Sequence, residues 1–263
     1  MNTPTVWITG ASSGIGEACA CRYARQGCRL VLTSSTEDSL RKAAEKCRRL
    51  GAADVCALPY DLSDPEGIER LATRAWNAFD GVDILFCNAG LSQRTGVEDT
   101  PMPMVRRLME VNFFAPAAIA KALLPRMVQH GGGRIAVTTS IAGRFGFPLR
   151  CAYSASKHAL YGFFETLRAE YGRQGISVTM VCPGRVRTRI SFNALEKDGS
   201  RHGVMDPGQD AGLSAEKAAR QIVRAIERRR YEVLVGRGEL LMVYLKRFLP
   251  GLCTRLAARI KPM

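Results

Sequence analysis

The stretch that decides the fold is Thr9-Gly10-Ala11-Ser12-Ser13-Gly14-Ile15-Gly16, which lies between a short β-rich run and a helical segment. A glycine cluster alone is often an ordinary turn. Between a strand and a helix, however, Gly10 permits a tight turn, and Gly14 and Gly16 let the backbone approach a phosphate. Free amide groups and the helix dipole then face the anion. We therefore predict a dinucleotide site that contains Gly10, Ser12, Ser13, Gly14, Ile15 and Gly16.

Strand-like and helix-like segments alternate from this stretch to residue 235. Strands are predicted at 5–9, 29–33, 55–58, 82–87, 134–139, 177–182 and 231–235. Helices are predicted at 17–26, 36–50, 65–79, 103–130, 153–173 and 214–229, with breaks in the long one near Pro116 and Pro125. This order predicts an α/β fold, a Rossmann-like, doubly wound, seven-stranded parallel sheet flanked by helices on both faces. Residues 191–212 show no clear periodicity and are expected to close over a ligand.

The composition is that of a globular protein, with 46% hydrophobic and 24% charged residues among 263. It excludes disorder, collagen and coiled coil for the whole chain. No apolar run approaches a membrane span, and the N-terminus does not resemble a signal peptide. One domain is predicted over 1–238, followed by a basic amphipathic extension over 239–263. The nine cysteines and three histidines have no metal-ligand spacing, so no metal is expected, and reduced thiols in the cytoplasm are expected.

A second set of residues indicates proton transfer. Tyr153 and Lys157 are four residues apart on a predicted helix, so they share one face. An ordinary tyrosine has a pKa near 10, and a nearby ammonium group lowers it, so that the phenol can exchange a proton with a substrate oxygen. Most Tyr-x-x-x-Lys pairs are merely a half-buried tyrosine and a solvated lysine. Ser140, at the end of a strand where ligands bind in such sheets, favours the catalytic interpretation.

These motifs resemble the short-chain dehydrogenase/reductase family, whose fingerprint is T-G-x-x-x-G-x-G. Further matches follow in order over residues 5 to about 235, namely Asn88-Ala89-Gly90, Asn112, Ser140, Tyr153-Ser154-Ala155-Ser156-Lys157, Pro183-Gly184 and Thr188. The resemblance implies an NAD(P)-dependent oxidoreductase that interconverts a secondary alcohol and a ketone by hydride transfer. It also implies a homodimer or homotetramer.

The resemblance assigns roles to the matching residues. Tyr153 is the general acid/base, Lys157 lowers its pKa and binds the ribose, and Ser140 and Tyr153 hold the substrate oxygen. Asn112 holds a water in a proton relay with Lys157. The remaining implied cofactor contacts are Asp61, followed by Leu62, at the adenine, Asn88, Ala89 and Gly90 at the adenosine ribose, and Pro183, Gly184, Val186 and Thr188 at the nicotinamide end.

The end of the second predicted strand bears on the choice of coenzyme. A carboxylate at this point binds the ribose 2′-hydroxyl and repels a 2′-phosphate. The chain has Thr33, Ser34, Ser35 and Thr36 instead, and its first acids, Glu37 and Asp38, belong to the next helix. NADP(H) is therefore favoured over NAD(H), with Ser34 and Ser35 as contacts, although the arginine of many NADP-using relatives is absent here.

Apolar residues near the expected nicotinamide site favour a hydrophobic alcohol or ketone as substrate, although each could equally be core packing. They are Leu91, Ile141, Ala142, Phe145, Phe147 and Leu149. Arg185 is either a contact for an anionic group on the substrate or an ordinary surface charge. Of these two interpretations, the surface charge is the favoured one.

The net charge of +14 suggests an acidic partner. No nucleic-acid-binding module is found, so nucleic acid is not expected. From Arg228 onward the sequence contains nine basic residues, including Lys261, and only two acidic ones, and leucines recur at intervals of three and four residues. This tail is expected either to pack on the body or a second subunit, or to make peripheral contact with an anionic membrane. The alternative to an enzyme is a nucleotide-loaded, non-catalytic binding or scaffold protein at such a surface.

Overall fold

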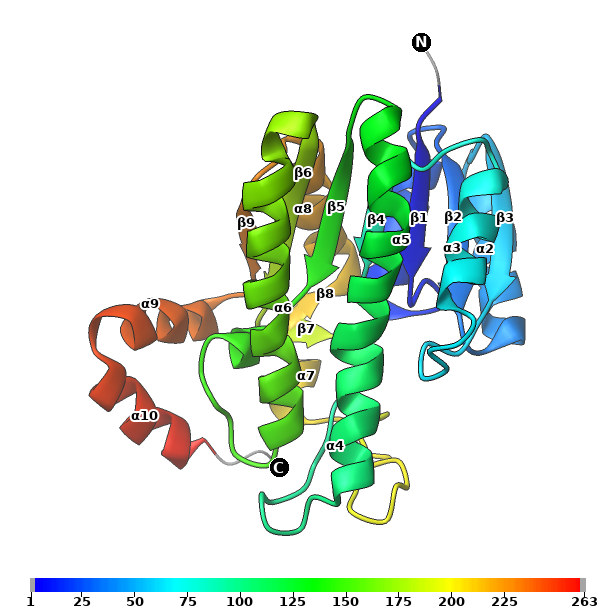
Figure 1. Ribbon diagram of the computed structural model, residues 1–263. Helices are drawn as coiled ribbons and strands as arrows, with labels where there is room; N and C mark the ends of the chain where they lie inside the picture. The colour runs from blue at the N-terminus through cyan, green and yellow to red at the C-terminus, as the bar shows by residue number, and fades with distance from the viewer. Residues whose placement is uncertain (1–2, 261–263) are drawn as a thin grey trace.

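A seven-stranded parallel sheet in the order β3-β2-β1-β4-β5-β6-β9 forms the centre of the computed structural model, which describes residues 3–260 (Figure 1). The strands are β1 Thr5–Thr9, β2 Arg29–Ser34, β3 Asp54–Pro59, β4 Ile84–Cys87, β5 Gly133–Thr138, β6 Ile176–Pro183 and β9 Glu232–Val235. The predicted fold class is confirmed. The sequence pattern was sufficient because the inner strands of a parallel sheet are buried on both faces and therefore occur as short apolar runs.

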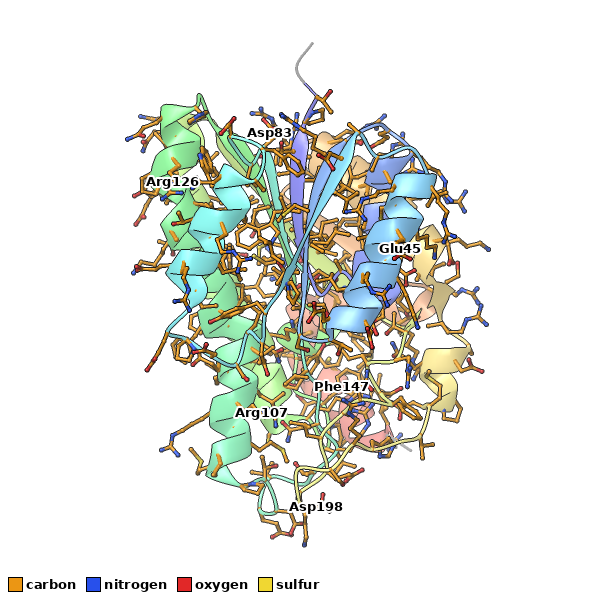
Figure 2. The ribbon with its side chains drawn as sticks, turned by 90° about the vertical axis from the view of Figure 1, so that its right-hand side faces the viewer. Glu45, Asp83, Arg107, Arg126, Phe147 and Asp198 are labelled. Atoms are coloured by element: carbon orange, nitrogen blue, oxygen red, sulfur yellow. The ribbon has the colours of Figure 1, made fainter. Side chains whose placement is uncertain are left out.

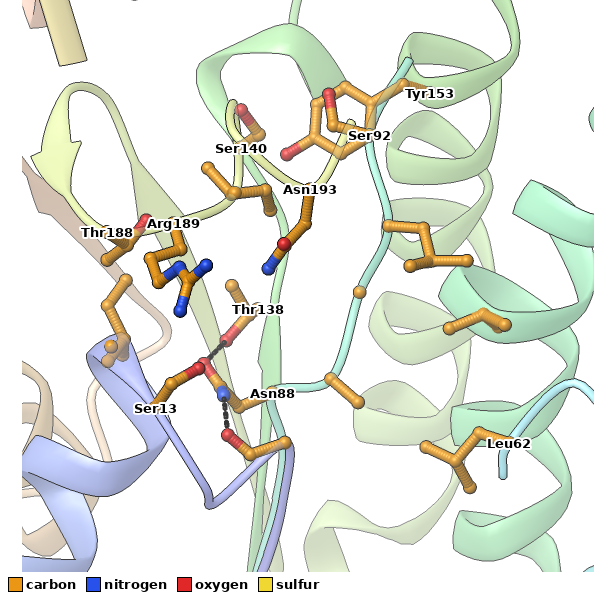
Figure 3. Close-up of a pocket in the computed structure, with 18 of the residues that line it drawn as sticks. Ser13, Leu62, Asn88, Ser92, Thr138, Ser140, Tyr153, Thr188, Arg189 and Asn193 are labelled. Atoms are coloured by element: carbon orange, nitrogen blue, oxygen red, sulfur yellow. Dashed lines mark hydrogen bonds between the residues drawn. The ribbon is translucent and has the colours of Figure 1, made fainter. Parts of the chain in front are cut away.

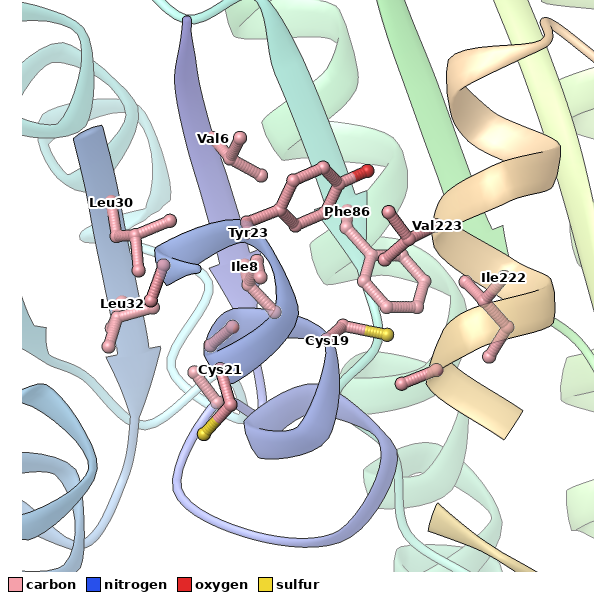
Figure 4. Packing of buried hydrophobic residues seen from close by; sticks show 14 of the residues in the cluster. Val6, Ile8, Cys19, Cys21, Tyr23, Leu30, Leu32, Phe86, Ile222 and Val223 are labelled. Carbon is pink, nitrogen blue, oxygen red and sulfur yellow. The ribbon is translucent and has the colours of Figure 1, made fainter. Parts of the chain in front are cut away.

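Helices cover both faces of the sheet. One face carries α1 Gly14–Ala24, α2 Glu37–Arg49 and α8 Ala215–Glu227, and the other carries α3 Ile68–Asn77, α5 Ala115–Gln129 and α6 Cys151–Tyr171. The bounds of α1, α2, α3, α6 and α8 lie within three residues of the predicted ones. Figure 4 shows the first of the two cores, in which Ile8, Leu32 and Phe86 of the sheet meet Tyr23 of α1 and Val223 of α8.

The side chains of the central strand β1 supply both cores. Trp7 points to the face opposite Val6 and Ile8 and is fully buried. Its indole Nε1 donates a hydrogen bond to Thr33 Oγ1 on β2 at 3.0 Å. A buried indole N–H needs such a partner, so Thr33 allows the largest side chain of the sheet to be buried without a desolvation penalty.

The predicted breaks at Pro116 and Pro125 are absent. α4 (Met102–Met109), a π-helical turn (Glu110–Phe114) and α5 form one continuous helix from Met102 to Gln129. Pro116 lies just after the π-helical turn, where the regular i→i−4 hydrogen-bond pattern is already interrupted, so its missing amide costs little. Pro125 is exposed, and the buried side chains of Leu123, Leu124 and Met127 hold the helix in place around it. By length and hydropathy this helix could cross a bilayer, but 56% of its most apolar window is buried, as in a core helix of a globular domain.

Two small elements organise the long segment at 191–212. β7 (Val186–Arg187) pairs with β8 (Leu213–Ser214) in a separate two-stranded sheet, and the short helix α7 covers Pro207–Asp210. The β7–β8 pair joins the two ends of the segment. It is therefore an anchored loop rather than a free connection.

The C-terminal residues form a 3-10 turn (Gly238–Leu240), α9 (Leu241–Phe248) and α10 (Pro250–Arg259), which lie beyond β9 at the side of the sheet (Figure 1). Cys253 and Ala257 are buried against Ile141, Phe145 and Cys182 in a separate small core. One side of this pair of helices therefore packs on the body. Lys261, counted with the basic tail, lies outside the described residues, and the boundary at 238/239 stays a prediction.

The sheet places its loops at two opposite ends of the molecule. Figure 2 shows Asp83, before β4, at one end and Arg107, Phe147 and Asp198 toward the other. The chain leaves β1 toward β2 on one side, whereas β4 pairs with β1 on the other side. This reversal of strand order opens a crevice at the carboxyl ends of β1 and β4, which is where doubly wound folds bind ligands.

Candidate active site

A cleft of about 400 Å³ lies at this crevice. Most residues predicted from the sequence line it, namely Gly10, Ser12, Ser13, Gly14, Ile15, Ser34, Ser35, Asp61, Leu62, Asn88, Ala89, Gly90, Ser140, Tyr153, Pro183, Gly184, Val186 and Thr188. Three predicted site residues, Gly16, Asn112 and Lys157, are not part of the lining.

The glycine turn is a cradle that side chains would fill. Gly10 and Gly14 have φ angles of +64° and +58°, in the left-handed region that favours glycine. A Cβ on Gly16 would lie 2.2 Å from Gly10 O and 2.6 Å from Asn88 Nδ2. Because α1 begins at Gly14, its first amide groups face the cleft, as a pyrophosphate requires. The residues present therefore fit a dinucleotide.

Asn88 fixes this cradle to the neighbouring strands. Its Nδ2 donates to the carbonyl oxygens of Thr9 and Gly10 at 3.2 and 3.3 Å, and its Oδ1 accepts from Thr138 Oγ1 on β5 at 3.2 Å (Figure 3). Its side chain therefore joins β1, β4 and β5 at the crevice. Arg189 lines the same cleft as Ser13 and adds a cation on the phosphate side (Figure 3).

Hydroxyl groups line the part of the cleft at the end of β2. Ser12 and Ser34 share a hydrogen bond of 2.7 Å between their Oγ atoms, and Ser35 and Thr36 complete the lining at the end of β2. Glu37 and Asp38 begin α2 and are not part of the lining. Asp61 receives hydrogen bonds of 2.9 Å from the amide and hydroxyl groups of Ser63 on one carboxylate oxygen.

Ser140 and Tyr153 lie together at the far end of the cleft, with their hydroxyl groups near each other (Figure 3). Ser140 follows β5, and its Oγ accepts a hydrogen bond of 3.1 Å from Ala142 N. Tyr153 is in the first turn of α6 and is almost completely buried. Two hydroxyl groups on rigid elements can hold one substrate oxygen between them.

Burial raises the pKa of Tyr153, and the Ser140 hydroxyl and the Arg150 and Arg94 guanidinium groups oppose this shift. The predicted lowering of this pKa by Lys157 stays a prediction. Lys157 Nζ lies 5.8 Å from the centre of the Tyr153 ring and donates to Thr138 O at 2.8 Å. Its own burial lowers its pKa to about 7, so its positive charge is incomplete at neutral pH.

Asn112 is buried in the π-helical turn, a departure from regular helix that often marks functional sites. Its Nδ2 donates to Leu91 O and Ser156 Oγ, both at 3.0 Å, and its Oδ1 accepts from Leu91 N at 2.8 Å. Asn112 and Lys157 both approach Gly90, where a Cβ would lie 3.1 Å from the Asn112 Oδ1 and 3.4 Å from the Lys157 Nζ. The water relay between them stays a prediction.

Gln93 is a site residue that sequence reasoning missed. It is fully buried, and its Oε1 accepts a hydrogen bond of 3.0 Å from the backbone amide of Tyr153. Its Nε2 donates to Thr95 and Thr100 at 2.9 and 3.1 Å. Gln93 thereby satisfies an amide in the first turn of α6 and holds the turn that carries Tyr153. No local signal in its polar segment points to a partner 60 positions away.

The apolar residues that line the substrate side of the cleft differ from those expected. Leu91 lines the cleft, with Val111, Ile190 and Leu195 as further apolar contacts. The predicted wall formed by Ile141, Ala142, Phe145, Phe147 and Leu149 is wrong, because none of them lines the cleft. The 3-10 turn Ile141–Gly143 directs the chain away from Ser140, so that Ile141, Phe145 and Phe147 pack with Cys253 in the C-terminal core instead.

Arginines also line the substrate side. Arg94, Arg107, Arg150 and Arg201 face the cleft there, whereas Arg185 is exposed outside it, with its backbone amide bonded to Glu239. The loop at 191–212 contributes Asn193, Leu195 and Arg201 to the lining. Within residues 3–260 no group of three or more His, Cys, Asp or Glu side chains is arranged to hold a metal ion.

A glycine cradle at the β1/β4 crevice, with a buried serine and tyrosine pair at its far end, defines a dinucleotide-dependent oxidoreductase of the Rossmann-like class. The family model described as short chain dehydrogenase matches residues 4–199. The chain belongs to the short-chain dehydrogenase/reductase family and binds a nicotinamide dinucleotide.

Relatives and solved structures agree with this membership. The chain is 39% identical to dehydrogenase/reductase SDR family member 7B of Bos taurus over 98% of its own length and 81% of that protein. A short-chain dehydrogenase/reductase of Burkholderia phymatum in complex with NAD has a TM-score of 0.83 at 26% identity and covers 100% of this chain and 97% of its own. A Sphingobium yanoikuyae enzyme in complex with NADPH has a TM-score of 0.79 at 29% identity and covers 98% and 96%.

Proposed function

We propose that the protein interconverts a secondary alcohol and a ketone, with NADP(H) as the preferred coenzyme and Tyr153 as the general acid/base. The observation that carries the proposal is the buried pair of Ser140 and Tyr153 at the end of a cleft that begins in the glycine cradle. A bound nicotinamide supplies or accepts the hydride. The side chains of the protein then have to hold the substrate oxygen and transfer one proton to or from it.

In the reducing direction Tyr153 donates its proton to the ketone oxygen, while the Ser140 hydroxyl donates a hydrogen bond to the same atom. In the oxidising direction the Tyr153 phenolate accepts the proton from the alcohol. Lys157 adds positive charge behind the phenol to the extent that it is protonated, and its hydrogen bond to Thr138 fixes its position. Burial of Tyr153 excludes competing water.

The coenzyme preference rests on the end of β2. Ser34, Ser35 and Thr36 line the cleft with hydroxyl groups and no carboxylate, which suits a 2′-phosphate. The structural neighbours include both an NAD and an NADPH complex, so the proposed preference is argued from the residues of this chain. Measurement of kcat/KM with NADPH and with NADH tests it. A tenfold preference for NADH would contradict the proposal.

The substrate proposed is a small hydrophobic molecule, because Leu91, Val111, Ile190 and Leu195 line the cleft beyond Ser140. Arg107 and Arg201 lie in the same lining, are exposed, and have no acidic partner among the described residues. A hydrophobic ketone that also carries an acidic group should therefore be reduced faster than its neutral ester. A screen of NADPH consumption over lipophilic ketones and 3-ketoacyl compounds tests both features.

The variant Tyr153→Phe tests the proposed chemistry. Turnover should fall by at least 10³-fold because the proton donor is lost, whereas NADPH binding should stay within about twofold. Tyr171→Phe, at the other end of the same helix, is the matched control and should retain full turnover. A nucleotide-loaded scaffold without catalysis, the alternative function, would show no turnover in the parent chain and no difference between the variants.

Peripheral membrane contact is proposed for the C-terminal helices, in an otherwise cytoplasmic protein. Their outward side exposes large apolar side chains, namely Leu241, Tyr244, Phe248, Leu249, Leu252 and Leu256. Lys246, Arg247, Arg255 and Arg259 accompany them, which suits an anionic bilayer. Flotation with vesicles containing phosphatidylserine should depend on residues 239–263, and equal flotation after their deletion would contradict the proposal.

A homodimer or homotetramer is proposed from the family resemblance. Phe114, half exposed at the start of α5 and in contact with Phe113, is a large apolar side chain that a second subunit would cover. Light scattering coupled to gel filtration measures the mass directly. A monomer at micromolar concentration would contradict this proposal.

A further inference from the structure

A buried ion cluster lies beside Tyr153 and is built from three distant parts of the chain. Arg94 follows β4, Arg150 immediately precedes α6, and Asp206 belongs to the loop at 191–212. Both guanidinium groups donate to the same oxygen, Asp206 Oδ2, Arg150 at 3.2 Å and Arg94 in direct contact. The Arg94 side chain is only 4% exposed. We call these three residues the Asp206 clasp.

The clasp is not electrically neutral. Two cations share one carboxylate, and the Nε atoms of both arginines are buried without a hydrogen-bond partner among the described residues. The other carboxylate oxygen, Oδ1, has His202 Nε2 at 3.9 Å, which is too far for a hydrogen bond. Burial, together with the neighbouring Arg94, lowers the pKa of Arg150 to about 10. An excess of about one positive charge is therefore held inside the protein.

This excess charge acts on Tyr153. The charged or titratable groups around the phenol are Arg94 and Arg150 of the clasp, Lys157 on α6, and Cys182 on β6, with the Ser140 hydroxyl after β5. Both arginines favour the phenolate, against the effect of burial. Because Lys157 is itself buried and incompletely charged, the clasp supplies positive charge that the tyrosine and lysine pair alone does not.

The clasp also fixes a loop over the cleft. Backbone hydrogen bonds of 2.9 Å join Arg94 N to Leu195 O and Leu195 N to Ser92 O, so the 191–212 loop runs beside the segment after β4. The Asp206 amide donates to Ser191 Oγ at 3.4 Å. Asp206 therefore binds the far part of this loop to the turn that carries Tyr153.

We propose that Asp206 is a positioning residue that acts through Arg94 and Arg150, fixing both guanidinium groups beside Tyr153 and setting the net charge that the phenol experiences. This inference rests on the proposed role of Tyr153 as general acid/base. It makes a prediction that a purely structural role does not make. Asp206→Asn removes the neutralising charge, whereas Arg150→Gln removes one of the two cations, so the two variants should shift the ionisation of Tyr153 in opposite directions.

The experiment is the pH profile of kcat for oxidation of 2-octanol with NADP⁺, in which the phenolate form is needed. The acid limb of Asp206→Asn should move to lower pH by about one unit, and that of Arg150→Gln to higher pH by about one unit, as expected for one elementary charge within the protein. Arg150→Lys retains the charge and should keep the parental limb. NADPH binding and thermal unfolding check that each variant is folded.

The phenolate absorbance near 295 nm, taken as the difference between each variant and the same variant with Tyr153→Phe, gives the ionisation without any turnover. If the parent protein does not oxidise 2-octanol, the proposed function fails for this substrate. The absorbance measurement still tests the role of the Asp206 clasp, because it needs no turnover. If Asp206→Asn does not fold, Arg150→Gln and Arg150→Lys carry the test. Shifts in the same direction, or no shift in Arg150→Gln, would overturn the role of the clasp.

Discussion

Lys157→Met should abolish turnover and at the same time stabilise the protein when no nucleotide is bound. Burial lowers the pKa of Lys157 from 10.5 to about 7. Three and a half pKa units correspond to about 5 kcal/mol against the charged form. Methionine has a similar volume and removes this cost, but it loses the hydrogen bond to Thr138 O, worth about 2 kcal/mol with the carbonyl left unpaired. The expected gain at pH 7 is about 2 kcal/mol.

The gain should shrink as the pH rises. Between about pH 7 and 10.5 the unfolded chain keeps the lysine proton while the folded chain has released it, so the stability contributed by Lys157 increases with pH. Urea unfolding at pH 7, 8 and 9 measures this. The difference between variant and parent should fall by about 2 kcal/mol from pH 7 to pH 9.

Variant and parent share all other titrating groups, so the contributions of these groups cancel in the difference between the two free energies of unfolding. Lys121→Met, on the exposed side of α5, controls for the lysine-to-methionine substitution itself. It should stay within about 0.5 kcal/mol of the parent at every pH. A Lys157→Met protein that is less stable than the parent at pH 7, by an amount independent of pH, would refute the reasoning. That result would mean that Lys157 stays fully charged in the folded state.

Three further outcomes are expected. Gly16→Ala should cost about 2 kcal/mol in thermal unfolding and weaken NADPH binding at least tenfold, because its Cβ would lie 2.2 Å from Gly10 O. Ser35→Asp should shift the ratio of kcat/KM for NADPH over NADH at least tenfold toward NADH, and an unchanged ratio would mean that β2 does not select the coenzyme. Glu232→Gln should cost about 2 kcal/mol in urea unfolding, because the carboxylate accepts from Arg144 at 2.5 Å and from Tyr161 at 2.8 Å. A loss below 0.5 kcal/mol would contradict this reasoning.

The sequence by itself determined the fold class and most of the lining of the cleft. Apolar periodicity is local, and so is the need for glycine where the turn after β1 takes positive φ at Gly10 and Gly14. Because every parallel strand ends at the same edge of the sheet, residues that follow successive strands meet there whatever the rest of the packing. Ser140 and Asn88 could be placed in one cleft for this reason.

Only the tertiary structure decided the course of the segment after Ser140, the continuous helix through Pro116 and Pro125, and the charges around Tyr153. Each depends on which surfaces are buried against each other, and such burial joins residues far apart in the chain. Arg94 and Asp206 are 112 positions apart, and no pattern in either segment predicts that one carboxylate holds two guanidinium groups there. The pKa of a buried phenol follows from that environment, so it could not be derived from the spacing of Tyr153 and Lys157 alone.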